Sequence, residues 1–278
     1  MVRSWESKLE RAKHHLSDFE ALIAPYEGRR AYPVREGREL NDDEWEYVSR
    51  IDIPEPADPL LPIIAGDIMS NLRSALDHLA VALSSEPHDR TAFPIFTDDI
   101  DAIDPDTGKY LHRKARRKWK ALTRGFPEGA MTIIEEAQPY MHSREGRDPQ
   151  YAALALLSVL QNADKHKRLV LVVSGLRDPI VWFNTGPGRK RRAPLRRVPE
   201  NRRVGPRTVV GRAREPLASH MNMEAEGTLD IMIGDREPSP EWSFDDPFYS
   251  CPFVFESMIR DLDGLIERLD RYVLDPSP

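Results

Sequence analysis

The sequence predicts an α+β fold in a single domain, residues 1–278: a helical bundle of about four long helices, with a small antiparallel β-sheet and a basic hairpin arm. The first observation is helical periodicity, since apolar residues recur every three or four positions over about 3–26, 62–84, 150–166 and 253–273. The second is the strand-like pattern of the insertions at about 30–54 and 168–235. The third is a run of arginines between two predicted strands, which places the arm at 186–214.

The first helix has the most regular apolar stripe, at alternating steps of four and three: Trp5, Leu9, Ala12, Leu16, Phe19, Ile23 and Tyr26. Pro25 and Gly28 are typical of its end. In the second helix Pro62 lies in the first turn, and the predicted core face is Ala65, Ile68, Leu72, Ala75, Leu76, Leu79 and Leu83. The last helix buries Phe255, Met258, Leu262, Leu265, Ile266 and Leu269.

The stretch from Ser84 to Glu128 is predicted to be mostly loop. Phe93–Phe96 (FPIF) is expected to be a short anchored segment within it, followed by an acidic loop from Asp98 to Asp106. A basic run, His112–Lys120, comes next, and a short helix is expected around Met131–Ala137.

Alternation of large apolar and polar residues predicts a half-buried strand over Trp45–Ile53, with a partner near Ala31–Arg35. Leu169–Val173 and Ile180–Phe183 are predicted as two strands joined by a turn at Gly175–Pro179. Further strands are expected at Thr208–Val210 and Thr228–Ile233, which would make the basic segment an arm between strands.

Composition limits the functional classes. The chain has 278 residues, 40% of them hydrophobic, which is enough to fill a core, and a formal net charge of −6. Cys251 is the only cysteine, which excludes an intrachain disulfide and a Cys-rich zinc module. The longest apolar runs are far shorter than the ~20 residues of a spanning helix. We therefore expect a soluble, cytoplasmic protein with no membrane association and no cofactor.

The second predicted helix carries four polar residues beside its apolar stripe. Asn71 and His78 lie on one edge, and Arg73 and Asp77 on the other. Five residues along an α-helix turn through about 500°, so Arg73 and His78 point ~140° apart. Any site here needs a neighbouring helix or a second subunit. The structural alternative is that Arg73 pairs with Asp77 at i, i+4 and that His78 hydrogen-bonds within the bundle.

A second polar cluster, Gln161–Arg168, ends the third long helix. Asn162 and His166 are four apart there, beside Asp164 and Lys165. The structural alternative is a helix C-terminus whose cations complement the helix dipole. We expect the two clusters to meet. If they do, His78 and His166 could bind a metal together with Asp77 and Asp164, as in a metal-dependent hydrolase. No HExxH motif accompanies them, so we predict no metal.

The segment RSALDH, Arg73 to His78, resembles the Arg-x4-His helix motif of the HEPN superfamily. This resemblance implies a metal-independent ribonuclease or an RNA-binding relative, of a defence or toxin type, with its site completed in a homodimer. Arg73 would stabilise phosphate charge and His78 would move a proton. The order of GDIMSNLRSALDHL, FPIF, QPY and QNADKHKRL also resembles conserved proteins of bacteria and phages, which implies no particular activity.

Two basic runs predict a polyanionic partner such as RNA. The predicted contacts are Arg113, Lys114, Arg116, Arg117, Lys118, Arg189, Lys190, Arg191, Arg192, Arg196 and Arg197. The predicted catalytic set is Asn71, Arg73, Asp77, His78, Asp164, Lys165 and His166. A non-catalytic interaction protein, in which the polar clusters only tie helices together, is the second hypothesis, and the metal-dependent hydrolase is the third.

Overall fold

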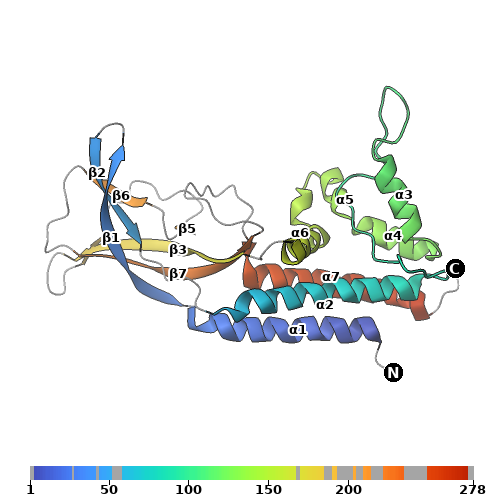
Figure 1. Cartoon of the computed structure of the whole chain (residues 1–278), viewed down its shortest axis with the longest axis horizontal. Helices are drawn as coiled ribbons and strands as arrows, with labels where there is room; N and C mark the ends of the chain where they lie inside the picture. The colour runs from blue at the N-terminus through green and yellow to red at the C-terminus, as the bar shows by residue number, and fades with distance from the viewer. Residues whose placement is uncertain are drawn as a thin grey trace. The chain divides into compact units, whose positions relative to one another are not determined.

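The structure is a computed structural model (Figure 1). It describes residues 3–26, 28–41, 44–51, 58–166, 170–184, 190–192, 203–204, 209–213, 222–234 and 249–274. The chain divides into two compact units. The helical unit comprises Met1–Phe19, Ile63–Leu169 and Pro252–Pro278, and the sheet unit comprises Glu20–Pro62 and Val170–Cys251. This division does not test whether the two units fold as one domain, so the single domain stays a prediction.

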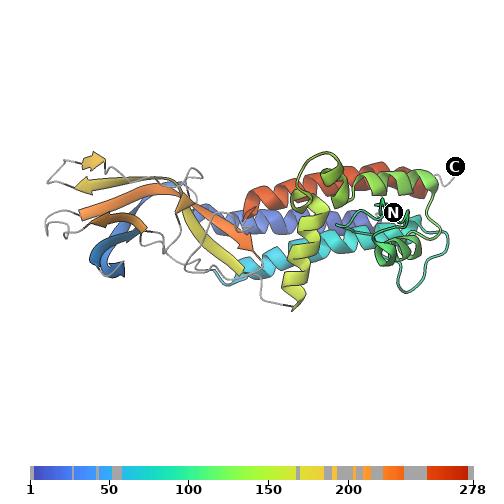
Figure 2. The same cartoon turned by 90° about the horizontal axis from the view of Figure 1, so that it is seen from above.

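Three long helices, α1 (Ser4–Ile23), α2 (Leu60–Leu83) and α7 (Cys251–Leu274), lie side by side (Figures 1 and 2). Helices α1 and α7 are antiparallel, because Arg3 pairs with Asp270 while Lys13 pairs with Asp263 at 2.9 Å. Phe19 meets Phe255 edge-on, with 5.4 Å between ring centroids. The apolar stripes are buried between the helices, so the predicted helix-dominated fold is confirmed.

Helix α2 supplies the centre of the core and begins at an acidic cap. The Asp58 carboxylate accepts a hydrogen bond from the Leu60 amide at 2.9 Å, which satisfies one of the free amides of the first turn. The predicted core face is buried: Ala65, Ile68, Leu72, Ala75, Leu76, Leu79 and Leu83 are each at most 4% exposed. Side chains that flank this face are therefore held in fixed positions.

Shorter helices complete the helical unit: α3 (Arg113–Leu122), α4 (Glu128–Glu136), α5 (Pro139–Arg144), the 3₁₀ turn η2 (Pro149–Tyr151) and α6 (Ala153–His166). Helix α6, yellow-green in Figure 2, crosses the long helices. A 3₁₀ turn, η1 (Ala24–Tyr26), follows α1, and Gly28 has φ of 100°, which suits glycine.

The basic run is a helix, so its prediction as loop is wrong. Its apolar residues are few but correctly spaced, since Ala115, Trp119 and Leu122 fall on one side of α3. Trp119 is 9% exposed and packs edge-on against Phe96, with ring centroids 6.0 Å apart. Burial of one large aromatic side chain is what places this charged segment against the core.

In the sheet unit, eight strands pair among the described residues: β1 (Arg29–Asn41), β2 (Glu44–Ile51), β3 (Val170–Asn184), β4 (Lys190–Arg192), β5 (Arg203–Val204), β6 (Val209–Ala213), β7 (Asn222–Gly234) and β8 (Tyr249–Ser250). The order is β4-β3-β7-β1-β2-β6, with β5 on β3 and β8 on β7, and every pairing is antiparallel.

Two local predictions about the strands need correction. The predicted turn at 175–179 is instead part of β3, which pairs with β7 on both sides of register shifts at Val173/Gly175 and Arg177/Ile180. The described parts of the basic arm do not form a separate hairpin, because β4 pairs with β3 whereas β6 pairs with β2. Hydrogen bonding to strands already present satisfies more backbone groups than an isolated two-stranded arm would.

No helix among the described residues is both long enough and apolar enough to cross a lipid bilayer.

Candidate functional site

Arg73 and Asp77 form an ion pair that holds the backbone of Phe93. The Arg73 guanidinium donates to Asp77 from Nε at 3.1 Å, and its Nη2 lies 2.8 Å from Asp77 Oδ1. The same Nη2 donates to the Phe93 carbonyl at 3.0 Å, while Asp77 Oδ1 accepts from the Phe93 amide at 2.9 Å. Both backbone groups of one residue are thus satisfied by two side chains of α2.

Gln138, at the start of α5, holds the other end of the same segment. This fully buried side chain accepts from the Phe96 amide at 2.9 Å and donates to the Pro94 and Ile134 carbonyls at 3.1 and 2.9 Å. We call residues Phe93–Phe96 the strap. Phe93 and Phe96 are buried at 1% and 8% exposure, so the predicted anchored segment is confirmed. An extended, buried segment needs such partners because it makes no regular backbone pairing.

The other two predicted residues of α2 differ from each other. Asn71 is 8% exposed and donates to the Asp67 carbonyl at 2.8 Å, one turn earlier in its own helix. His78 is exposed. The pairing of Arg73 with Asp77 that the structural alternative expected is therefore present, whereas His78 makes no hydrogen bond to any other described residue.

The second polar cluster lies at the end of α6, whose backbone continues to His166. The side chains of Asp164, Lys165 and His166 lie outside the described residues, so the expected meeting of the two clusters stays a prediction. Within the part of the chain that is described, no group of three or more His, Cys, Asp or Glu side chains is arranged to hold a metal ion.

Most of the basic residues of α3 are exposed and have no acidic partner among the described residues. Six of its ten residues are Lys or Arg, and none is acidic. Arg116 forms an ion pair with Asp101 and lies over the Tyr110 ring, 3.9 Å from its centroid. The others are exposed and form no ion pair with any described residue. We call these five the basic face: Arg113, Lys114, Arg117, Lys118 and Lys120.

The predicted contacts of the second basic run are only partly described. Lys190, Arg191 and Arg192 lie on the short strand β4, where the backbone alone is described. Arg189, Arg196 and Arg197 lie outside the described residues.

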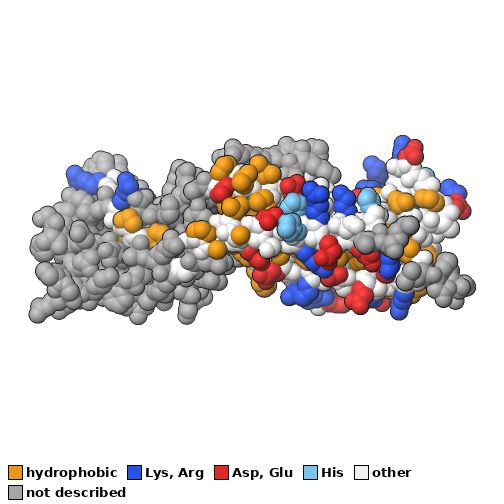
Figure 3. All heavy atoms as spheres, turned by 90° about the horizontal axis from the view of Figure 1, so that it is seen from below, with side chains coloured by type: hydrophobic (Ala, Val, Ile, Leu, Met, Phe, Trp, Pro, Cys, Tyr) orange, Lys and Arg blue, Asp and Glu red, His pale blue; other side chains and the backbone are white. Residues whose placement is uncertain are grey.

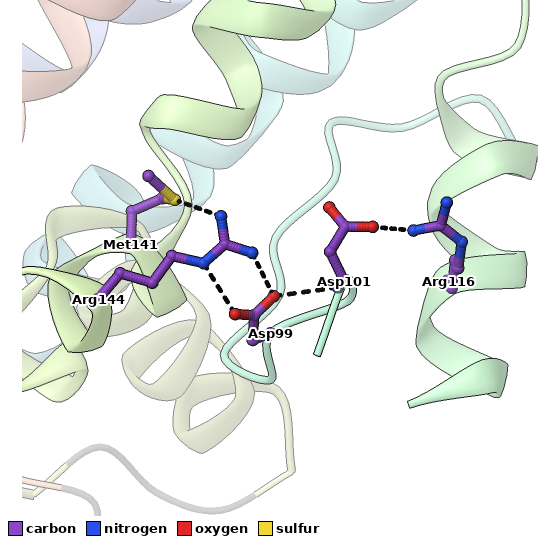
Figure 4. Close-up of polar contacts among 5 residues, drawn as sticks. All are labelled: Asp99, Asp101, Arg116, Met141 and Arg144. Carbon is purple, nitrogen blue, oxygen red and sulfur yellow. Dashed lines mark hydrogen bonds and ion pairs between the residues drawn. The ribbon is translucent and has the colours of Figure 1, made fainter. Parts of the chain in front are cut away.

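The acidic loop provides ion pairs to the neighbouring helices (Figure 4). Asp99 accepts two hydrogen bonds from Arg144, at 2.6 and 2.8 Å, and also accepts from the Asp101 amide at 3.0 Å. These bonds to Asp99 raise the pKa of the Arg144 guanidinium. Asp101 pairs with Arg116. These ion pairs attach the acidic loop to α5 through Arg144 and to α3 through Arg116.

The start of α3 is electrostatically unfavourable. A helix N-terminus carries partial positive charge, yet the first turn has Arg113, Lys114 and Arg116 and no acidic residue. The N-cap residue, His112, makes no capping side-chain bond. Each misplaced cation costs about 0.3–1 kcal/mol at low ionic strength. Two carboxylates of the acidic loop offset part of this cost, since Asp98 lies 3.6 Å from the His112 ring and Asp101 pairs with Arg116. Arg113 and Lys114 have no such partner among the described residues, and a local preference left violated in this way is typical of a functional surface.

A pocket of about 460 Å³ lies beside the basic face, between α3, α4 and the acidic loop. Its lining combines Trp119, Phe126 and Met131 with the charged groups Asp101, Arg116, Lys120 and Glu135. Gly125 also lines it, with φ of 73°, and a Cβ there would lie 2.9 Å from the Glu86 amide. The closeness of that backbone explains the glycine.

The sequence did not predict Gln138 of the strap region or Glu135 of the pocket as site residues, and it placed Lys120 in the basic run without naming it among the predicted contacts. The helix start at Pro139 gave no signal for Gln138, because its side chain makes no capping bond and bonds instead to the strap and to the Ile134 carbonyl. Nothing in the spacing of Lys120 and Glu135 distinguished them from other charged residues, since packing alone brings them to one pocket.

Comparison with known proteins finds no matching family model, no matching curated protein and no matching solved structure. Function is therefore inferred from the residues of this chain.

Proposed function

We propose that this protein binds RNA through the basic face of α3. One observation carries the proposal: five exposed cations, none with an acidic partner among the described residues, lie together on a short helix. Two of them, Arg113 and Lys114, lie in the first turn, where they oppose the helix dipole. Phosphate groups would neutralise these charges and release condensed counterions, which provides the affinity.

The surface of the long helices provides an internal comparison. Acidic and basic side chains are interspersed on the face of the helical unit in Figure 3, which views the molecule from below. Cations of α1 and α7 pair with carboxylates there, as Arg3 does with Asp270 and Lys13 with Asp263. Interspersed charges of both signs are typical of a solvated surface with no particular partner. The basic face of α3 differs because it carries cations only.

The test compares two charge-matched variants. Arg113→Gln combined with Arg117→Gln removes two charges from the basic face. Arg11→Gln combined with Arg260→Gln removes two charges from exposed positions on α1 and α7. Affinity for a short single-stranded RNA is measured by fluorescence anisotropy at several salt concentrations.

The α3 variant is expected to weaken binding and to reduce the slope of log affinity against log salt by about 1.4, which is two phosphate contacts at ~0.7 each. The control variant keeps the wild-type slope. Equal slopes in both variants, or no binding by the wild type, would contradict the proposal.

Cleavage of RNA by Arg73 and His78, the HEPN-like prediction, has a separate test. RNA is incubated with wild type, Arg73→Ala and His78→Ala in the presence of EDTA. Cleavage that resists EDTA and is lost in both variants supports a metal-independent ribonuclease, whereas binding without cleavage favours the non-catalytic hypothesis. The geometry favours the latter, since Arg73 is already engaged with Asp77 and Phe93. Homodimer formation also stays a prediction.

A further inference from the structure

The pocket beside α3 has the size and lining of a small-molecule site. Its volume of about 460 Å³ falls within the range of roughly 300–1,000 Å³ typical of ligand pockets. Apolar surface comes from Trp119, Phe126 and Met131, and a buried aromatic wall is what an unstacked nucleobase packs against.

The side chains of two of its charged residues form no hydrogen bond or ion pair with a described residue. The first is Glu135, in the last turn of α4, whose partly buried carboxylate interacts with Arg144 and Tyr140 only through longer-range electrostatics. Lys120, in the last turn of α3, is an exposed member of the basic face. In contrast, Asp101 and Arg116 of the same lining are satisfied by each other. The acceptor positions of the Glu135 carboxylate are therefore open to a ligand that supplies hydrogen-bond donors.

We propose that this pocket binds a guanine base of single-stranded RNA, an inference that depends on the proposed function of the basic face. A carboxylate only accepts hydrogen bonds, and an ammonium only donates them. Guanine offers two adjacent N–H donor groups, N1–H and the N2 amino group, beside the O6 acceptor. Glu135 accepts from the two donors, and Lys120 donates to O6.

The other bases fit this pair of groups less well. Adenine and cytosine present one amino donor group to Glu135, and uracil presents a single N–H between two acceptor oxygens that the carboxylate repels. A bidentate hydrogen-bonded pair discriminates against the wrong base by roughly tenfold or more in affinity. The phosphates on either side of the bound base would lie on the basic face, because Lys120 belongs both to that face and to the pocket lining.

The experiment uses two nine-nucleotide RNAs, all uridine or uridine with one central guanosine, and measures binding by fluorescence anisotropy at fixed salt. Three proteins are compared: wild type, Glu135→Gln and the control Glu136→Gln. Glu136 is the adjacent residue of α4 and pairs with Arg268 at 2.6 Å, outside the pocket lining. Circular dichroism and urea unfolding establish that all three fold equally.

We expect wild type and Glu136→Gln to bind the guanosine RNA roughly tenfold more tightly than the uridine RNA. We expect Glu135→Gln to lose this preference while keeping its affinity for the uridine RNA. Replacing the guanosine by inosine, which lacks the N2 amino group, should reduce the preference of the wild type. The same replacement should leave the affinity of Glu135→Gln unchanged.

Binding without a guanosine preference, or a preference that persists in Glu135→Gln, would overturn the pocket inference and leave the basic face intact. Loss of the preference in Glu136→Gln as well would also overturn it, because the effect would then be one of overall charge. Failure of the wild type to bind either RNA would instead overturn the proposed function and this inference together.

Discussion

The strap and the basic face lie in the same helical unit, and both were expected from polar residues in the sequence, yet the structure uses them in opposite ways. At the strap, Arg73, Asp77 and Gln138 hydrogen-bond to the backbone of Phe93, Pro94 and Phe96. On the basic face, five cations are exposed and lack acidic partners among the described residues. The comparison shows that saturation of hydrogen bonds, and not polarity alone, separates a structural polar residue from a candidate binding residue.

The largest expected effect is at the most saturated residue of the strap. Gln138→Ala removes three hydrogen bonds and leaves buried amide and carbonyl groups without partners, at about 1–3 kcal/mol for each such group. We expect the free energy of unfolding, measured in urea, to fall by roughly 3 kcal/mol or more. Gln150→Ala, at an exposed position, is the control and should change it by under about 0.5 kcal/mol. A small loss in Gln138→Ala would contradict the structural role of the strap.

The Arg73–Asp77 pair should show a moderate effect on stability. We expect Asp77→Ala to cost about 1–2 kcal/mol, because the Phe93 amide and the guanidinium each lose an acceptor. A double-mutant cycle with Arg73→Ala should give a coupling energy above about 0.5 kcal/mol. The same cycle on the exposed Arg147–Glu145 pair, used as control, should give less. Equal coupling energies in the two cycles would show that the Arg73–Asp77 pair, which binds the strap, stabilises the fold no more than a surface ion pair does.

The basic face should respond in the opposite sense to the strap. Arg113→Glu places a negative charge in the first turn of α3, so we expect the unfolding free energy to rise by about 0.5 kcal/mol while RNA affinity falls. Arg271→Glu reverses a charge in the last turn of α7, where a cation is favourable. It should lower stability by a similar amount and leave RNA binding unchanged. A loss of stability in Arg113→Glu would show that this arginine has a structural partner after all.

The smallest expected effect is a local pH dependence at Asp104 in the acidic loop. Its carboxylate accepts from the Asp106 amide at 2.9 Å and the Thr107 amide at 3.3 Å, and these bonds lower its pKa. Because the folded-state pKa is depressed, the stabilisation of this turn is present above the ordinary value of 3.8 and is lost as pH falls through the lowered value. The amide chemical shifts of Asp106 and Thr107 should titrate with a midpoint below 3.8. Asp104→Asn should abolish that titration, and a midpoint at or above 3.8 would contradict the geometry.

Periodicity in the sequence was sufficient to locate the long helices, because the apolar stripes of α1, α2 and α7 are continuous over many turns. It failed for α3, where charged residues outnumber apolar ones and one buried tryptophan decides the packing. The sequence pattern also predicted a turn at Gly175–Pro179, inside what is the single strand β3. Residues typical of a turn are accommodated there as irregularities in the pairing with β7.

For the candidate site, the sequence by itself determined which polar residues share a helix face, including the pairing distance between Arg73 and Asp77 and the concentration of cations on one segment. Only the tertiary structure decided which of those groups are already satisfied. Arg73 and Gln138 reach backbone groups of the strap, and Glu135 reaches the pocket beside Lys120 from a different helix. Contacts between residues distant in sequence depend on how helices and loops pack, which local periodicity does not specify.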